Sequence, residues 1–596
     1  MKSPSRESVL GSKWHQKPFD ERLSKVMTQR HDITETLANL LASRDVSLDE
    51  VEHFLDPKIK NALPNPFDLS GMQEAVDHVI DAVKKNKKIT LFADYDVDGA
   101  TSSATLKRFF REVGIEVDIY IPDRVLEGYG PNSQALLNLK KTGTDLVITL
   151  DCGTVAFKPL EDAAKAGLDI IVIDHHLGVL EKPDALAVIN PNLLNEPFPH
   201  KDLCAAGVAF LFAVAANKGL RDIGFYQGRK EPNLLQLLDL VALGTVCDVM
   251  PLTGLNRAFV TAGLKVLKQR KNIGLRAICD LAELNEEPTS YHFGFVIGPR
   301  INAGGRVGKS DLGARMLSSE DESEVKAIAQ QLEEFNKQRK DIETQVLEES
   351  IKALESGQGG FKTSDPVIFV ASKHWHQGVI GIVASRLKDL YNKPVAVIAI
   401  DDEGKKGKAS CRSITGVDFG AEILSARLEG LLLEGGGHAM AGGFSVEPDK
   451  IADLHQFFCN KLGEKVAELS GQKNSEYDIE LDLAQVNIDL LKEISALEPF
   501  GVGNPRPKFI LRNVQKLRGK IVGKTQEHIS CTFSSKSVIG FSNQIQAISF
   551  KSVDTAVGDI LLNAKASKSL NLVGTLNINS WMGVEKVQMI IEDILI

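Results

Sequence analysis

The chain has 596 residues, of which 43% are hydrophobic and 25% are charged, and its formal net charge at pH 7 is −9. It is too long for a single hydrophobic core, and its size predicts roughly three to five domains. The acidic total disfavours a protein that coats DNA nonspecifically. It does not exclude a nucleic-acid enzyme, because local patches of charge govern that interaction.

The sequence shows no sign of a membrane-spanning or secreted segment. Its beginning, "MKSPSRESVLGSKWHQKPF", lacks the apolar core of a signal peptide, and no apolar run reaches the length that spans a membrane. Seven cysteines are dispersed without a CxxC pair, which is typical of a reducing compartment and disfavours a thiolate zinc site. We therefore expect a cytoplasmic protein without a membrane partner.

From about residue 88 to residue 248, short β-rich runs alternate with helical patterns. Strands are expected at "KITLFADYD", "EVDIYIP", "DLVITLD" and "DIIVIDHH", and helices at "ATSSATLKRFFREVG" and "FKPLEDAAKAG". This alternation predicts a parallel sheet covered by helices. Ligands bind beyond the carboxyl ends of the strands in such sheets, and three of these runs end in acid-rich segments.

Residues 319–356 predict a long helix. Apolar side chains follow a three-four spacing from Val325 to Val346, and Ser319 and Glu322 are placed for a capping box. A helix of about 35 residues would span roughly 50 Å. It is either a connector between two lobes or an amphipathic helix on one domain, and the pattern fits both. After it, "PVIFVASKHWHQGVIGIVASRL" and "KPVAVIAI" resume a strand-and-helix pattern.

From Tyr477 onward, short alternating runs are separated by Gly, Asn and Ser. They predict an all-β barrel or sandwich of about a hundred residues. Basic residues recur along its first strands, which fits a groove for nucleic acid or an exposed strand face equally well. These residues are Lys508, Arg512, Lys516, Arg518, Lys520 and Lys524.

An acidic cluster follows the first predicted strand. Asp94, Asp96 and Asp98 occupy alternate positions, so their carboxylates share one face of an extended segment. Three carboxylates packed together are costly unless cations neutralise them. The alternative is a turn-forming, helix-capping cluster, which is common where a strand leads into a helix.

Asp151 and Asp248 also follow apolar segments, and each alone would fit a cap or a turn. Asp174, His175 and His176 are less ordinary, because a carboxylate with two imidazoles beyond a parallel strand is typical of a metal or catalytic site. Since side chains alternate along a strand, we expect the two histidines to point in different directions. Asp174 would then orient one of the imidazoles.

The ligand types narrow the choice of metal. An oxygen-rich set with one or two imidazoles and no thiolate favours Mn²⁺ or Mg²⁺ over structural zinc. More than four carboxylates suffice for two divalent ions that share a bridging Asp. Two such ions stabilise an in-line displacement at phosphorus and activate a water near neutral pH.

The motifs also carry a family resemblance. In chain order, "ADYDVDG", "LDCGT", "IDHH" and "GTVCDVMPL" resemble the four motifs of the DHH phosphoesterase superfamily. Farther along, "GPRINAGGRVG", "HWHQGVIGIVASRL", "GGGHAMAGGF" and "LEPFGVGNPRPKF" are similar to segments of the RecJ family of bacterial single-stranded-DNA exonucleases. The resemblance extends over residues 60–596, and the combination of motifs is specific although no single motif is.

The resemblance implies a 5′→3′ exonuclease on single-stranded DNA that uses two Mn²⁺ or Mg²⁺ ions in DNA recombination and repair. It implies an α/β multidomain chain, with a single-strand-binding protein and a RecQ-type helicase as further partners, and the multi-lobe layout suggests a monomer. The expected order is an N-terminal segment (1–60), a parallel-sheet DHH domain (61–318), a connecting helix (319–358), an α/β DHH-associated domain (359–466) and an OB-like β-barrel (475–596).

Motif position carries the roles of the family's metal-site residues over to this chain. Asp151 is expected to bridge the two ions, and His176 to face the scissile phosphate. Many relatives carry a His four residues before the first ligand Asp, where this chain has Phe92. The first ion is therefore expected to have a poorer shell or to use Asp94 or water. The implied ligands are Asp96, Asp98, Asp151, His175 and Asp248.

Substrate contacts near the metals are implied in two segments. Arg300, Asn302 and Arg306 lie among glycines that let the backbone approach a ligand closely. The resemblance implies that they contact phosphates of the DNA strand near the metals. A surface loop with solvated arginines is the alternative. His438 would touch the scissile phosphate, unless it is an incidental residue of a glycine turn.

A terminal-phosphate pocket is implied by three further residues. Arg124, Ser410 and Arg412 resemble the family's pocket for the 5′ phosphate. A guanidinium and a hydroxyl suit this group, because Arg binds phosphate through two parallel hydrogen bonds.

Two other functions fit part of the sequence. A DHH phosphodiesterase acting on short oligonucleotides or cyclic dinucleotides would use the same chemistry, but a small substrate needs neither a second lobe nor a barrel. A non-catalytic DNA-binding scaffold is disfavoured because inactive DHH relatives lose motif carboxylates that this chain retains.

Overall fold

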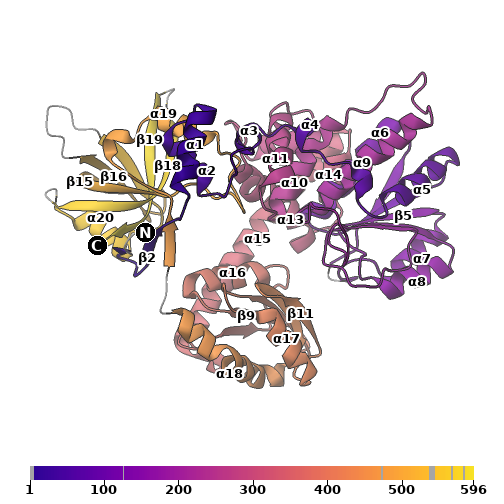
Figure 1. Ribbon diagram of the computed structural model, residues 1–596. Coiled ribbons are helices and arrows are strands. Elements are labelled where there is room, and N and C mark those ends of the chain that lie inside the picture. The colour runs from indigo at the N-terminus through magenta and orange to yellow at the C-terminus, as the bar shows by residue number, and fades with distance from the viewer. Residues whose placement is uncertain are drawn as a thin grey trace. The chain divides into compact units, whose positions relative to one another are not determined.

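The computed structural model describes residues 6–124, 126–470, 474–535, 544–565, 568–581 and 584–595. The chain divides into two compact units (Figure 1). The larger comprises residues 63–250 and 259–471, and the smaller comprises residues 1–62, 251–258 and 472–596. In the described part of the chain, no helix is both long and apolar enough to span a membrane.

The first part of the larger unit is built on a five-stranded parallel sheet with the order β4-β3-β5-β6-β7. Every residue of β3 and β5 is buried, as expected where helices cover both faces of a sheet. The predicted parallel sheet is thus confirmed. Its strands are β3 (Ile89–Ala93), β4 (Val117–Tyr120), β5 (Leu146–Leu150), β6 (Asp169–Ile173) and β7 (Ala187–Ile189).

Helices surround this sheet and form a further helical layer beyond it. The helix α6 is wedged between β3 and the apolar helices α9 and α10. The helices are α5 (Met72–Lys84), α6 (Val97–Val113), α7 (Ser133–Lys141), α8 (Phe157–Lys165), α9 (Ala205–Asp222), α10 (Leu238–Cys247), α11 (Gly254–Leu267), α12 (Ile273–Leu281), the π-helix η3 (His292–Ile297), α13 (Gly298–Val307) and α14 (Leu312–Ser318).

The helix α15 (Glu322–Ser356) contacts α12, α13 and α14 at one end and α16 (Ile380–Tyr391) at the other (Figure 1). It is therefore the predicted connector between two lobes. The predicted capping box is wrong, because Asp321 caps the helix by accepting hydrogen bonds from the backbone N–H groups of Ser323 and Glu324. Glu343 is buried in α15 between Arg339, at 2.5 Å, and Arg386 of α16, which fixes the connector to the second lobe.

The second lobe is a five-stranded mixed sheet with the order β11-β12-β10-β9-β8. Its core contains the buried rings of Phe369, Phe419 and Phe458. The strands are β8 (Ile368–Ser372), β9 (Val395–Ile400), β10 (Gly407–Arg412), β11 (Glu434–His438) and β12 (Ala441–Val446), and its other helices are α17 (Phe419–Leu428) and α18 (Ile451–Ser470).

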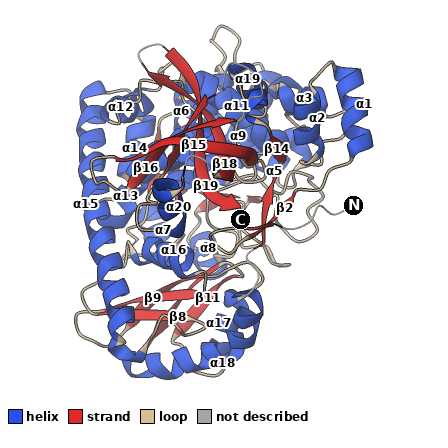
Figure 2. Cartoon of the chain, turned by 90° about the vertical axis from the view of Figure 1, so that its left-hand side faces the viewer, coloured by secondary structure: helices blue, strands red, loops and turns tan. Residues whose placement is uncertain are grey.

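The smaller unit contains a β-barrel, because β15 also pairs with β18 and so closes the sheet β14-β15-β16-β17-β19-β18 (Figure 2). This confirms the predicted C-terminal barrel. Its elements are β14 (Ile479–Leu481), β15 (Phe509–Val522), β16 (His528–Ser535), β17 (Gln544–Ser549), β18 (Ser569–Trp581), β19 (Val584–Leu595), α19 (Ile488–Ser495) and α20 (Ala556–Asn563).

The N-terminal residues share the core of this barrel, since Leu40 and Leu41 belong to the same buried cluster as Leu511 and Phe533. The N-terminal elements are β1 (Arg6–Glu7), β2 (Lys13–Gln16), α1 (Glu21–His31), α2 (Glu35–Ala42), α3 (Val51–Leu55) and α4 (Ile59–Ala62), and β2 pairs with β13 (Asn474–Tyr477).

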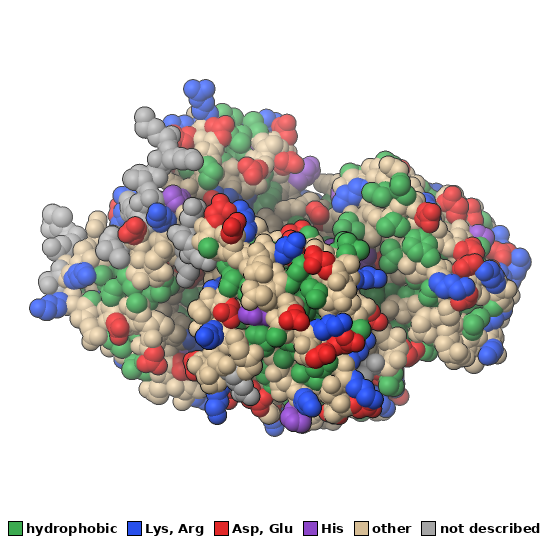
Figure 3. Space-filling model, turned by 90° about the horizontal axis from the view of Figure 1, so that it is seen from below, with side chains coloured by type: hydrophobic (Ala, Val, Ile, Leu, Met, Phe, Trp, Pro, Cys, Tyr) green, Lys and Arg blue, Asp and Glu red, His purple; other side chains and the backbone are tan. Residues whose placement is uncertain are grey.

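Three of the basic residues on β15 have structural partners, and one of them, Arg518, donates a hydrogen bond to Thr532 Oγ1 at 2.9 Å. Lys516 is buried and donates hydrogen bonds to the carbonyls of Leu561 and Leu562, and Arg512 forms an ion pair with Glu480. The strand is therefore not a uniform basic face. On the face of the molecule seen in Figure 3, Lys and Arg side chains are likewise interspersed with Asp and Glu side chains.

Arg257 organises the centre of the smaller unit. It is 1% exposed and donates hydrogen bonds to the carbonyls of Phe54, Leu497 and Glu498 at 2.7–3.0 Å. Its guanidinium lies 4.0 Å from the centroid of the Phe54 ring. Burial lowers the pKa of Arg257 to about 10, so the side chain is still charged at neutral pH. One cation thus joins the N-terminal segment, residues 251–258 and the "LEPFGVGNP" segment.

Replacing this cation should destabilise the smaller unit. In Arg257→Met the carbonyls lose a buried donor, and we expect the free energy of unfolding to fall by about 3 kcal/mol. Urea unfolding followed by tryptophan fluorescence in a Trp375→Phe background measures this, because the two remaining tryptophans both belong to the smaller unit. Arg30→Met, which breaks an exposed ion pair with Asp49, is the matched control and should cost less than about 1 kcal/mol. Equal stability of the two variants would contradict the assigned role.

Candidate metal centre and active site

The strand register of the parallel sheet places three aspartates side by side. Ala93 of β3 pairs with Leu150 of β5, and Leu150 pairs with Ile173 of β6. The next residue on each strand is an aspartate, and neighbouring strands lie about 4.8 Å apart. Asp94, Asp151 and Asp174 therefore form a row at the carboxyl edge of the sheet. The strand order reverses between β3 and β5, where open α/β sheets bind their ligands.

Asp96 and Asp98 both contact helix N-termini. One oxygen of Asp96 accepts hydrogen bonds from Asp98 N and Gly99 N at the start of α6. The two oxygens of Asp98 accept from Ala205 N and Ala206 N, at the start of α9, at 2.6 and 2.9 Å. The capping alternative is therefore correct for part of each carboxylate. A Cβ at Gly99 would lie 2.2 Å from the carbonyl oxygen of Asp94, so α6 starts this close to the strand end because that residue is glycine.

His175 connects three of the carboxylates. Its Nε2 lies 3.2 Å from Asp151 Oδ1, 3.5 Å from Asp248 Oδ2 and 3.8 Å from Asp98 Oδ2. Its side chain is 10% exposed, and burial lowers the pKa of His175 below its ordinary value. A neutral imidazole among carboxylates is the form that binds a metal ion.

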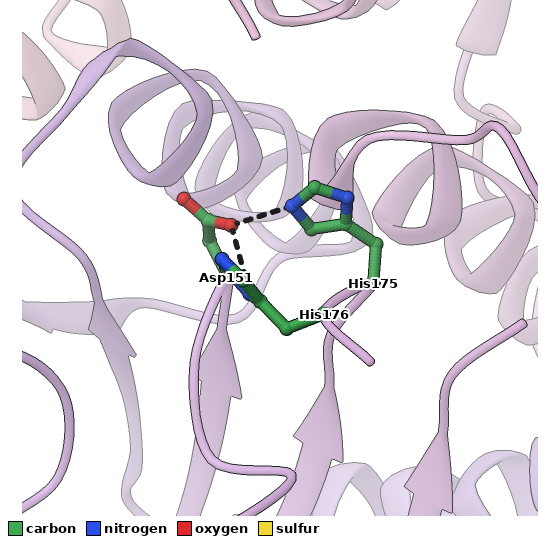
Figure 4. A group of neighbouring side chains, drawn as sticks. All are labelled: Asp151, His175 and His176. Carbon is green, nitrogen blue, oxygen red and sulfur yellow. Dashed lines mark ion pairs between the residues drawn. The ribbon is translucent and has the colours of Figure 1, made fainter. Parts of the chain in front are cut away.

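The expectation that the two histidines point in different directions is wrong. The strand β6 ends at Ile173, so the alternation of side chains does not extend to His175 and His176. Their ring centroids lie 4.6 Å apart, and both rings face Asp151 (Figure 4). Asp174 does hold an imidazole as predicted, because its Oδ1 accepts a hydrogen bond from His176 Nδ1 at 2.8 Å.

The charge of Asp174 sets the protonation of His176. Burial acts to lower the pKa of His176, but the hydrogen bond to Asp174 and its charge outweigh burial and raise the pKa to about 9. Bonds from Thr154 N and from the backbone N–H groups of both histidines also hold this carboxylate. Despite burial, these contacts keep the pKa of Asp174 below its usual range.

Tyr129 is a site residue that the sequence analysis missed. Its hydroxyl donates a hydrogen bond to the carbonyl oxygen of Asp151 at 2.9 Å and lies 3.4 Å from the His176 ring nitrogens. Asp151 has a φ of 62°, in the left-handed region, which is uncommon for a residue with a side chain. The Tyr129 bond helps to hold this conformation. Tyr129 lies in the segment "DRVLEGYG" together with Arg124, but a single tyrosine has no spacing pattern that identifies it as a site residue.

A cavity of about 260 Å³ opens over this cluster. Arginines face the carboxylates across it, and burial together with the charges of Arg124, Arg339 and Arg412 lowers the pKa of Arg306 to about 10. Arg306 also donates to the carbonyl oxygen of Gly378 in the second lobe at 3.0 Å. The lining residues that the sequence had singled out are Asp94, Asp96, Arg124, Asp151, His176, Asp248, Asn302 and Arg306.

Four predicted substrate contacts do not line this cavity. Arg300 forms an ion pair with Glu333 of α15 and donates to the carbonyl of Val296, so it fixes α13 against α15. Ser410 and Arg412 lie together on β10, with Arg412 Nη1 3.3 Å from the hydroxyl. His438 is exposed on the edge strand β11.

Three family models match successive parts of the chain. They are the DHH family N-terminal domain at residues 88–245, the DHHA1 domain at residues 364–464 and the RecJ OB domain at residues 477–593. The single-stranded-DNA-specific exonuclease RecJ of Bacillus subtilis strain 168 is 32% identical, covering 98% of this chain and 71% of that protein. The Escherichia coli K12 protein of the same name is also 32% identical, covering 96% of this chain and 99% of that protein.

This chain belongs to the RecJ family. Its structure is similar to that of RecJ from Thermus thermophilus in complex with Mn²⁺, with a TM-score of 0.78 and 26% identity over 97% of this chain and 78% of that one. The complex of the same protein with Mg²⁺ gives a TM-score of 0.73 and 25% identity over 97% of this chain and 77% of that one. The fold class predicted from the sequence is thereby confirmed.

The RecJ site of this chain has the donor atoms that two divalent cations need. Within the described residues, four of its buried atoms lack a hydrogen-bond partner, namely Asp94 Oδ1, Asp151 Oδ1, His175 Nε2 and Asp248 Oδ2. Three groups of ligand atoms, each within 4.8 Å of one another, lie around them. Two of the groups share no residue, namely Asp94, Asp96 and Asp151, and Asp98, His175 and Asp248, whereas the third, Asp151, His175 and His176, overlaps both. Carboxylate oxygens with one imidazole suit Mn²⁺ and Mg²⁺.

Phe92, where the chain departs from the RecJ pattern, is a core residue. The Phe92 ring is fully buried and stacks on Tyr120 at 5.2 Å, so this residue belongs to the core. Asp94 follows on the same strand edge, is 4% exposed, and falls in one of the two ligand groups. It was predicted only as a substitute ligand, although the alternation of Asp94, Asp96 and Asp98 was the signal that could have included it.

Proton binding at this site predicts how metal binding depends on pH. Burial, with the charge of a neighbouring aspartate, raises the pKa of Asp94 to about 8 and that of Asp248 to about 9. These two groups therefore contribute stability to the metal-free protein that is fully present below the ordinary Asp pKa and is lost as the pH rises through these values. A divalent cation must displace these protons, so its affinity should rise over the same range.

We expect a fixed concentration of Mn²⁺, equal to about 100 times its Kd at pH 8.5, to raise the Tm by about 4 °C near pH 8.5 and by less near pH 6. Differential scanning calorimetry with Mn²⁺, Mg²⁺ or chelator measures this difference. Asp248→Asn is the matched control, because it keeps the shape of the side chain and removes one titrating ligand. An equal gain at both pH values would contradict the protonation of the site.

Proposed function

We propose that this RecJ-family chain is a metal-dependent exonuclease that hydrolyses single-stranded DNA from its 5′ end. The observation that carries the proposal is the two ligand groups at Asp151 and His175, which lie beneath an arginine-lined cavity. Among the described residues, four buried donor atoms of these groups lack a hydrogen-bond partner. The related proteins from B. subtilis and E. coli are named single-stranded-DNA-specific exonucleases. A role in DNA recombination and repair follows from the family.

The metal ligands are assigned from the two groups. Asp94, Asp96 and Asp151 would hold one ion, and Asp98, His175 and Asp248 would hold the other. When bound, two such ions neutralise the phosphate and lower the pKa of water, which gives a nucleophile near neutral pH. Asp151 is the bridging candidate, because its Oδ1 also lies 3.2 Å from His175 Nε2. The backbone of Asp151, held by Tyr129, fixes where this shared carboxylate points.

His176 would stabilise the charge that develops on the phosphate. Its Nδ1 donates to Asp174, which keeps the ring in one orientation and leaves Nε2 for the substrate in the cavity. With a pKa of about 9 the imidazole is protonated at neutral pH. A cationic donor aimed at the reacting phosphate lowers the barrier because the charge on its oxygens increases in the transition state.

The arginines would set the polarity of digestion. Arg124 and Arg306 line the cavity beside the carboxylates, and the charge of Arg412 is close enough to lower the pKa of Arg306. Arginines suit a terminal phosphate because of its two negative charges. Ser410 and Arg412 would complete this pocket from the second lobe, while Asn302 would contact the preceding phosphate. Arg300 and His438 would contact the same DNA strand outside the cavity.

The remaining assignments are proposals of the same kind. We propose the domain limits given by the sequence, a monomer as the active form, and a single-strand-binding protein and a RecQ-type helicase as partners. Seven cysteines are free, which supports a reducing cytoplasmic location.

One experiment tests metal requirement, strand type and polarity together. Single strands and duplexes labelled at the 5′ or the 3′ end are incubated with Mn²⁺, Mg²⁺ or chelator, and the products are sized over time. We expect immediate release of the 5′ label from single strands, late release of the 3′ label, and no cleavage with chelator. Faster hydrolysis of a dinucleotide than of a long strand would instead favour the small-substrate phosphodiesterase.

The two histidines should separate metal binding from catalysis. We expect His175→Ala to weaken Mn²⁺ binding at least about tenfold, because it removes a ligand. His176→Ala should leave Mn²⁺ binding nearly unchanged and lower kcat about 100- to 1000-fold, as the loss of one transition-state donor does. Calorimetric titration with Mn²⁺ and kcat on a single strand measure both. Metal loss in His176→Ala would show that this residue is also a ligand.

A further inference from the structure

Two aromatic side chains lie exposed and stacked on each other beside the active site. Tyr291 is 60% exposed and Phe295 is 71% exposed. Their ring centroids lie 5.0 Å apart, with an angle of 22° between the ring planes. Aromatic rings of this size are usually buried. Such a pair therefore offers two flat apolar faces to a ligand.

The backbone beneath the pair is rigid. Tyr291 immediately precedes the π-helix η3 and Phe295 lies within it, and the other face of η3 buries Phe293 and Ile297 completely. His292 anchors the turn through Glu286 and the backbone N–H of Thr289, both at 2.9 Å. π-Helices are rare and occur frequently at functional sites. The two rings are thus presented in a fixed orientation.

The helix that carries the pair leads directly into the catalytic cavity. The π-helix η3 continues without a break into α13, whose Asn302 and Arg306 line that cavity. Tyr291, Phe295, Pro299, Asn302 and Arg306 all lie on the accessible side of this helical run. Seven residues separate Phe295 from Asn302, which corresponds to about 10 Å along the axis. This is about the length of three stacked nucleotides.

The same helix also packs against a metal ligand. The carbonyl of Phe293 accepts a hydrogen bond from the Cys247 thiol at 3.4 Å, and Asp248 is the next residue. The aromatic pair therefore lies on an element in direct contact with the end of α10, where the reaction site begins. Of the two glutamates that precede the pair, Glu287 forms an ion pair with Lys268 and Glu286 accepts a hydrogen bond from His292.

Unpaired bases are the occupant that this surface fits. The arginine-lined cavity suits a phosphate, so a strand held there must continue along one of its walls, and the helix surface from Asn302 to Tyr291 is continuous with it. A base stacks on an exposed ring whatever its identity, which suits a nuclease without sequence preference. The bases of a duplex are already stacked on each other and do not present their faces in this way.

We propose that Tyr291 and Phe295 form a base-stacking platform for the nucleotides that follow the scissile phosphate, and that this platform contributes to the preference for single-stranded DNA. The inference rests on the proposed function and deepens it, because it assigns a contact to bases where the cavity contacts phosphates. The platform binds the strand and takes no part in the chemical step.

The test compares the full-length protein with Tyr291→Ala/Phe295→Ala. The substrate is a 5′-phosphorylated single strand of about 20 nucleotides, with or without abasic residues at its third to sixth positions. With Mn²⁺, we expect the double substitution to raise KM about five- to tenfold with little change in kcat. On the abasic strand the two proteins should have the same KM. Tyr291→Trp/Phe295→Trp, which keeps two rings, should restore the low KM on the intact strand.

Leu390→Ala is the control, because it removes an equally exposed apolar side chain from α16. An unchanged KM in the alanine double variant, or an equal abasic penalty in both proteins, would overturn the platform, and would leave the rings free for a protein partner instead. Strand binding is also measured by fluorescence anisotropy in chelator. If the wild-type protein degrades no strand, the proposed function fails, and this binding comparison still decides whether the rings contact bases.

Discussion

Five aspartates meet at the carboxyl edge of one parallel sheet, and their mutual repulsion opposes their burial until cations bind. Burial raises the pKa of Asp94, Asp98, Asp151 and Asp248. In the metal-free protein these carboxyl groups therefore bind protons more readily, at the positions where cations would otherwise bind. The protein holds these groups together through its backbone. Strand register fixes Asp94 and Asp151, and the N-terminus of α9 fixes Asp98. Because the strands and the start of α9 already hold these side chains in place, little conformational entropy is lost when a cation binds to them.

Charge of the opposite sign lies close to this acidic edge. Arg124 and Arg306 face the carboxylates across the same cavity, and the charges of Arg339 and Arg412 are near enough to lower the pKa of Arg306. In the proposed function, a phosphate would bind between the two sets of charges, attracted by the arginines and by bound cations. The connecting helix α15 makes this possible, because the buried Glu343 ties it to Arg386 of the second lobe while Arg300 ties it to α13.

Bases and phosphates would then contact different parts of the same helical run. The arginine end of α13 lies in the cavity, whereas the aromatic rings of η3 lie in solvent about two turns away. Phosphate contacts give affinity without regard to strand type, and stacking on rings requires bases with free faces. A preference for single strands would therefore need no recognition of the base sequence.

The sequence by itself determined the parallel sheet, the connecting helix, the C-terminal barrel and the acidic and imidazole residues of the site, because local periodicity and closely spaced motifs encode them. The tertiary structure decided how those residues are used. His175 and His176 converge because β6 ends at Ile173, and Asp94 lies beside Asp151 because its strand is in register with β5. The roles of Tyr129 and of the Tyr291–Phe295 pair depend on tertiary contacts and on solvent exposure, and no sequence spacing predicts either of these. Arg257 joins segments hundreds of residues apart. Such long-range contacts depend on which distant segments the tertiary fold brings together, and a local sequence pattern does not determine this.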